Sequence, residues 1–71
     1  MIVYQPLWET MKKQRVTAYH LVHYHGYSSH TIYRLRHNLG ISTALLNDLC
    51  ELLDCRVEDI LEYTPDRKEK I

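Results

Sequence analysis

The 71-residue sequence contains few cysteines, glycines and prolines, two of each, and no phenylalanine. Cys50 and Cys55 are too few for a disulfide framework and form no Cys-x-x-Cys pair, so we expect them to act as small buried apolar side chains. No apolar run is long enough to span a membrane. Because the first residues carry neither a basic nor an apolar leader, we expect no signal peptide and a cytoplasmic location.

Catalytic motifs are also absent: the sequence has no glycine-rich phosphate loop, no nucleophile elbow and no HExxH motif. So short a chain has little room to enclose a substrate pocket, so we expect neither an enzyme nor a cofactor site. His20, His23 and His25 form a His-x-x-His-x-His string, but on a helix His25 points away from the other two. We therefore expect no metal site, a solvated His20 and His23, and a partly buried His25.

Charge is balanced overall but unevenly distributed along the chain. Nine Lys and Arg residues match nine Asp and Glu residues. The segment Thr10–Asn47 holds five Lys or Arg residues, all five histidines and no acidic residue, whereas Asp48–Ile71 holds eight acidic residues and four basic ones. This asymmetry favours a polyanionic partner for the first half of the chain, with an ordinary solvated surface as the alternative.

Helical periodicity and capping residues predict three helices in the basic half. The first runs from Leu7 to about Gln14, just after Pro6. The second, Ala18–His25, has Thr17 as its N-cap residue and ends at Gly26. The third, Ser29–Arg36, has Ser28 as its N-cap residue, and Asn38 or Gly40 is expected to form the left-handed turn that follows.

The second half predicts a long apolar helix and a short one. Ser42 is the N-cap residue of a fourth helix, Thr43–Leu53, whose leucines form the largest apolar surface of the chain. A fifth helix is expected at about Val57–Leu61. Residues 2–4 and 61–64 have a strand-like composition, which allows a short antiparallel ribbon between the two ends of the domain. Residues 66–71 are charged and lack apolar anchors, so we expect a frayed tail.

The second and third predicted helices, joined by a short turn at Gly26, follow the helix-turn-helix pattern. Leu21 and Val22 on the second helix face Ile32 and Leu35 on the third. The other face of the third helix then projects outward with hydroxyl, imidazole, phenol and guanidinium groups and no carboxylate. Such a helix fits the DNA major groove, which is about 12 Å wide, and can present hydrogen-bond donors to base edges.

Over about residues 6–63 the chain resembles the Cro/repressor-type (xenobiotic-response-element, XRE) helix-turn-helix regulators of bacteria and phage. The resemblance is carried by TAYHL at 17–21, by GYSSHTIYRL at 26–35 and by LCELLDCRVEDIL at 49–61. It implies an all-α domain of five helices over residues 1–65 that binds operator DNA, usually as a dimer. Two positions depart from the family pattern: Val22 stands where Ala or Gly is usual, and His25 where an apolar residue is usual.

By position in the family pattern, Ser29, His30 and Arg34 correspond to residues that read bases. Phosphate contacts are expected from the turn and third helix, from the start of the second helix and from the first helix, at Ser28, Tyr33, Arg36, His37, Thr17, Ala18, Lys12 and Lys13. Lys12 and Lys13 are equally well explained as the solvated side of the first helix.

The sequence therefore predicts a non-enzymatic, sequence-specific regulator of transcription, a repressor in the simplest case, that binds double-stranded DNA as a homodimer. A regulatory protein partner is left open. The alternative is a protein-interaction module of the same fold, an antitoxin-like or adaptor subunit, whose acidic C-terminal half docks a partner.

Overall fold

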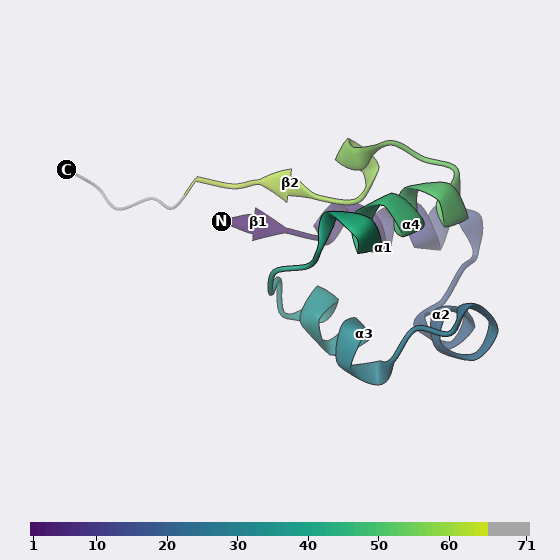
Figure 1. The fold of residues 1–71 in the computed structure, drawn as a ribbon. Helices are drawn as coiled ribbons and strands as arrows, with labels where there is room; N and C mark the ends of the chain where they lie inside the picture. Colours follow the sequence, from purple (N-terminus) through teal and green to yellow (C-terminus); the bar gives the residue numbers. More distant parts are fainter. Residues whose placement is uncertain (66–71) are drawn as a thin grey trace.

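The computed structural model describes residues 1–65, and the predicted frayed tail at 66–71 lies outside the described residues. The elements follow one another as β1 (Ile2–Val3), α1 (Gln5–Gln14), α2 (Ala18–His25), α3 (Ser29–Arg36), α4 (Thr43–Leu53), the 3₁₀ turn η1 (Val57–Asp59) and β2 (Glu62–Tyr63). Helices α1 and α4 pack against each other, with α2 and α3 together on one side of them and the β1–β2 ribbon extending away from the body (Figure 1). No helix among residues 1–65 is long and apolar enough to cross a membrane.

The bounds of α2, α3 and α4 agree with the sequence prediction because each has a local start signal. The hydroxyl oxygens of Thr17, Ser28 and Ser42 each accept a hydrogen bond from the backbone N–H three residues later, at 3.2, 3.1 and 3.0 Å. The chain reverses after α2 at Gly26, with φ at 77°, and after α3 at Asn38, with φ at 58°. Asn38, and not Gly40, is therefore the left-handed residue of the second turn.

The first helix begins two residues earlier than predicted, at Gln5. Pro6 occupies its first turn, where a missing N–H costs nothing. The N–H of Leu7 is bonded to the carbonyl of Tyr4 at 3.0 Å and to that of Ile60 at 3.1 Å, so the first turn is tied to the far end of the chain. Arg15, with φ at 60°, ends α1.

The prediction of a fifth α-helix is wrong: residues 1–65 contain four α-helices, and Val57–Asp59 forms only one 3₁₀ turn. Tertiary contacts stop the helix. The carbonyl of Asp59 accepts a hydrogen bond from the Thr10 hydroxyl at 2.8 Å, and that of Ile60 accepts the one from Leu7. The chain then leaves as a strand, so the predicted ribbon is confirmed, with Ile2 opposite Tyr63 in an antiparallel pair.

The core draws on every helix and on both ends of the chain. Its buried members are Tyr4, Leu7, Met11, Leu21, Ile32, Leu35, Leu49, Leu53 and Ile60. Three burial predictions are corrected. His20, expected to be solvated, is half-buried, because its side chain folds back over the start of α2 and accepts from the N–H of Thr17. His25 is exposed, because Tyr27 just beyond the end of α2 packs against the core instead. Cys50 and Cys55 are half-buried free thiols, and the N–H of Cys55 donates to the carbonyl of Cys50 at 3.0 Å in the loop that ends α4.

Burial raises the pKa of the Cys55 thiol, and the neighbouring Cys50 and Asp59 raise it further. The neutral thiol is therefore favoured over the thiolate that most cysteine chemistry requires. This agrees with a packing role for the pair at the end of α4.

We expect Gly26→Val to destabilise the domain by at least about 1–2 kcal/mol, the usual cost of left-handed backbone for a residue with a Cβ. No atom lies within 4 Å of the position a Cβ would take, so the cost comes from the backbone at φ 77° and not from a clash. Urea unfolding followed by circular dichroism measures it. Gly40→Ala is the matched control, because Gly40 has no positive φ and its nearest contact, Arg34 Nη2 at 3.9 Å, is ordinary. Equal stability of the two variants would contradict the assignment of Gly26 as the turn residue.

Candidate DNA-binding interface

The start of α2 is organised by a reciprocal cap. The hydroxyl of Thr17 accepts from the N–H of His20, and the Nδ1 atom of His20 accepts from the N–H of Thr17 at 3.1 Å. The imidazole therefore takes the part that a glutamate side chain usually plays, without adding negative charge. The positive end of the α2 dipole is thus left without a nearby acidic side chain.

The turn and first residues of α3 present small polar groups. Ser28 Oγ accepts from the N–H of Thr31 and lies 3.0 Å from its hydroxyl, which fixes the start of the helix. Ser29 and His30 follow directly and are exposed. Tyr33, one turn later, is 53% exposed, and its ring centroid lies 4.1 Å from that of His37. These side chains share one acid-free surface, as the sequence predicted.

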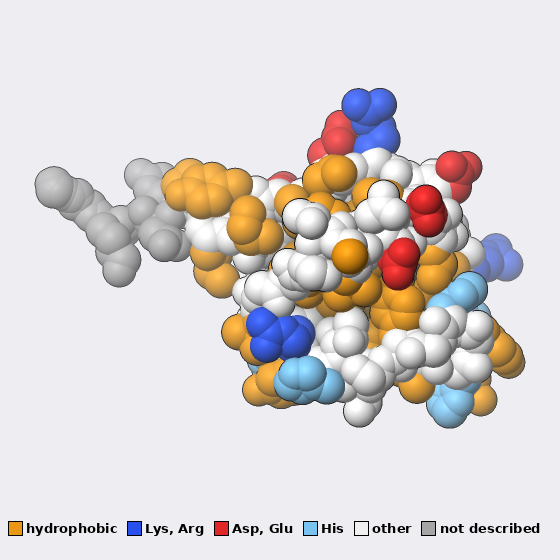
Figure 2. All heavy atoms as spheres, viewed as in Figure 1, with side chains coloured by type: hydrophobic (Ala, Val, Ile, Leu, Met, Phe, Trp, Pro, Cys, Tyr) orange, Lys and Arg blue, Asp and Glu red, His pale blue; other side chains and the backbone are white. Residues whose placement is uncertain are grey.

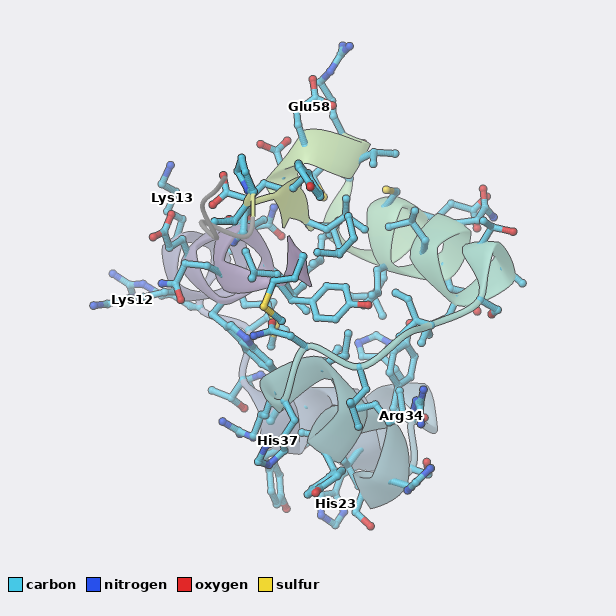
Figure 3. The ribbon with its side chains drawn as sticks, turned by 90° about the vertical axis from the view of Figure 1, so that its left-hand side faces the viewer. Lys12, Lys13, His23, Arg34, His37 and Glu58 are labelled. Carbon is cyan, nitrogen blue, oxygen red and sulfur yellow. The ribbon has the colours of Figure 1, made fainter. Side chains whose placement is uncertain are left out.

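Arg34 departs from the expectation of a free outward side chain. It is half-buried, and its Nε and Nη2 atoms donate to the carbonyl of Gly40 at 2.9 and 2.7 Å. Figure 3 shows Arg34 beside the segment that leads from α3 to α4. No motif in the sequence marked Gly40 as a partner of α3, since the bond joins a side chain to a backbone carbonyl in an irregular loop.

The other Lys and Arg residues predicted to contact DNA lie in two places. Arg36 is exposed and stacks over Trp8, with its guanidinium carbon 5.1 Å from the ring centroid, so it joins α3 to α1. Lys12 and Lys13 lie in the last turn of α1 and are exposed. Figure 3 shows both lysines on α1, apart from Arg34 and His37 on the lower pair of helices, so they do not form one cluster with the α3 residues.

A shallow groove of about 360 Å³ runs between α2 and α3. Val22, one of the two departures from the family pattern, lines it together with Ile32. Tyr19 and His23 stand on the α2 side of the groove, with ring centroids 4.1 Å apart, and Tyr33 stands on the α3 side. Nothing in the sequence pattern indicated this paired Tyr–His surface on α2.

Charge is segregated in space as it is in sequence. From Ala18 to Arg36 there is no acidic residue. Figure 2 shows histidines over α2 and α3 on the lower half of the molecule, and the Asp and Glu side chains over α4 and η1 on the upper half. Helices α2 and α3 therefore contribute no carboxylate that would repel a polyanion.

Comparison with known proteins identifies this arrangement. A crystal structure of the transcriptional regulator VanUg is similar, with a TM-score of 0.82 and 29% sequence identity over 92% of this chain and 87% of that one. No curated protein matches the sequence. The family model of the Cro/C1-type HTH DNA-binding domain matches residues 6–66. With four helices and a helix-turn-helix unit whose own residues include no acid, the chain belongs to the Cro/C1-type helix-turn-helix family of DNA-binding transcriptional regulators.

Proposed function

We propose that this chain is a sequence-specific repressor of bacterial or phage type that reads the DNA major groove with α3. The observation that carries the proposal is the outward face of α3, where exposed Ser29 and His30 follow a fixed turn and no carboxylate repels phosphate. Residues 1–65 act as the DNA-binding unit, by binding and not by catalysis, in the cytoplasm where the operator lies.

In this proposal each side chain has a role set by its position. Ser29, His30 and Arg34 read base edges. Phosphates are held by the start of α2, by the turn and later part of α3, and by α1, at Thr17, Ala18, Ser28, Tyr33, Arg36, His37, Lys12 and Lys13. The hydroxyls of Thr17 and Ser28 already accept bonds from the backbone. A hydroxyl has one donor and two acceptor sites, so the donor of Thr17 can still bond a phosphate oxygen. The donor of Ser28 can do so when the Thr31 hydroxyl, 3.0 Å away, is the donor of the bond between the two.

A twofold dimer is the expected DNA-bound form. One short helix spans only about four or five base pairs, too few for specificity in a genome, and dimers of helix-turn-helix proteins place two such helices about one DNA turn apart. Selection of bound duplexes from a random pool tests the whole proposal. We expect one enriched site with an inverted repeat whose half-sites are centred about 10 base pairs apart. An enriched site without symmetry would contradict the dimer.

The acidic surface of α4 and η1 favours a second candidate, a protein-interaction module such as an antitoxin-like or adaptor subunit. Its described acidic residues are Asp48, Glu51, Asp54, Glu58 and Asp59. Salt separates the two candidates, because phosphate contacts alone weaken steeply with salt and carry no sequence information. Preference for one sequence that persists at moderate salt supports the repressor. Weak, sequence-independent binding that is lost with salt supports the interaction module.

A further inference from the structure

Arg34 is bound to the loop after α3 through one edge of its guanidinium. Nε and Nη2 lie on the same side of the planar group, and both donate to the carbonyl of Gly40. A guanidinium carries five N–H donors, so this arrangement occupies two of them. The opposite edge, formed by Nη1 and the second hydrogen of Nη2, has no hydrogen-bond partner among residues 1–65.

The carbonyl that binds Arg34 belongs to a loop held by Tyr4. The N–H of Tyr4 donates to Asn38 Oδ1 at 2.9 Å, and its phenolic oxygen donates to the carbonyl of Leu39 at 2.7 Å. Tyr4 itself is only 2% exposed. The loop is thus fixed at two consecutive residues just before Gly40, by the backbone N–H and the buried phenol of Tyr4, which follows β1.

Tyr4 and Arg34 are also linked electrostatically. Burial raises the pKa of the Tyr4 phenol, and the nearby positive charge of Arg34 partly offsets that rise. The phenol therefore stays protonated at neutral pH and can continue to donate to Leu39.

We propose that Tyr4 is a positioning residue for base recognition, which acts through the loop Asn38–Gly40 to orient Arg34 so that its unoccupied edge is presented to guanine. The inference rests on the proposed function, and it assigns a base specificity to Arg34, one of the residues proposed to read bases. Guanine is the base that fits, because its O6 and N7 atoms accept two parallel N–H bonds from a guanidinium edge. Lysine cannot replace arginine here, since a single ammonium group cannot bind a fixed carbonyl and a base through two separate edges.

Holding the Arg34 side chain in place before DNA binds contributes to the discrimination between guanine and the other bases. A free arginine loses rotamer freedom when it binds a base, whereas one already bound to Gly40 has lost most of that freedom on folding. A fixed edge also meets a wrong base in the wrong geometry, instead of moving to a nearby phosphate. Removing the support from the loop should therefore reduce sequence preference more than it reduces binding to DNA in general.

The experiment measures binding of the full chain to its selected duplex and to versions of it altered at one base pair at a time. Arg34→Lys identifies the base pair that Arg34 reads, as the position where guanine preference is lost. Tyr4→Phe should lower the preference at that same base pair about 2- to 10-fold, the amount that holding one long side chain is worth. The affinity of the Tyr4→Phe variant for unrelated DNA should stay unchanged. Asn38→Gly, which keeps the left-handed turn and removes the other support of the loop, should have the same effect.

Tyr63→Phe is the matched control, because it removes an exposed phenol from β2 and should change neither preference nor affinity. Thermal unfolding verifies that each variant is folded. If Tyr4→Phe and Asn38→Gly keep the full preference at the position that Arg34→Lys relaxes, the inference is wrong. If Arg34→Lys relaxes no position while the wild type selects a site, Arg34 only braces the loop and the inference is wrong, but the proposed function stands. If the wild type selects no site, both are wrong.

Discussion

Leu35→Ala is expected to cost about 2–5 kcal/mol of unfolding free energy and to leave the domain only marginally stable. Leu35 is fully buried and lies on α3, in the same cluster as Leu7, Leu21 and Leu49. Removing its side chain leaves a cavity where α3 meets the core. Folded domains have stabilities of about 5–15 kcal/mol, and one this small has a value near the lower end.

The measurement is urea unfolding followed by far-ultraviolet circular dichroism, with DNA binding recorded in parallel. Leu39→Ala is the matched control: it makes the same truncation four residues later, at a side chain that is 38% exposed. We expect its cost to be below about 1 kcal/mol. Leu35→Ala should lose DNA binding in proportion to the fraction of the domain that is unfolded. A folded Leu35→Ala variant with the stability of Leu39→Ala would show that α3 is not anchored by this residue.

The helix-turn-helix unit could be predicted from sequence because its determinants are local. Thr17, Ser28 and Ser42 each mark a helix start within three residues, and Gly26 marks the reversal between α2 and α3. Periodicity also identified Leu21, Ile32 and Leu35 as core residues, and all three are buried. These signals need no knowledge of the rest of the chain, so α2, α3 and α4 have the predicted bounds.

The predictions that failed depend on how side chains and carbonyls pack in the folded domain. Val57–Leu61 has the composition of a helix, but Thr10 and Leu7 in α1 bind two of its carbonyls and the chain turns into β2. His25 lies on the apolar stripe of α2, but Tyr27 packs against the core in the following turn. The contacts from α1 lie far away in the sequence. Tyr27 lies only two residues after His25, but helical periodicity does not show which of the two side chains packs against the core.

In the candidate site, too, local features could be predicted from the sequence, whereas contacts formed only in the folded domain could not. The exposure of Ser29, His30 and Tyr33 could be read from helical periodicity. The bonds of Arg34 to Gly40 could not, because they depend on how the loop after α3 lies against Tyr4, more than 30 residues earlier. The sequence therefore indicates which residues face outward, whereas the structure adds how one of them is held.

Arg34→Ala is expected to relax the preference at one base pair in each half-site. A bidentate arginine–guanine pair contributes about 1–3 kcal/mol of discrimination, which is about 5- to 150-fold in relative affinity. Lys13→Ala is the comparison, because an exposed lysine in the last turn of α1 reaches phosphates at most. Its loss should weaken binding to all sequences alike and reduce the salt dependence by about one charge.

Both variants are measured against duplexes altered at each position of the selected site, at two or more salt concentrations. Comparing the two variants distinguishes a base contact from a phosphate contact. Loss of any positive charge weakens binding, whereas only loss of a base contact changes the order of preferred sequences. A uniform loss of affinity from Arg34→Ala, with preference intact at every base pair, would assign Arg34 to the phosphate backbone. Base reading would then rest on Ser29 and His30, the exposed residues at the start of α3.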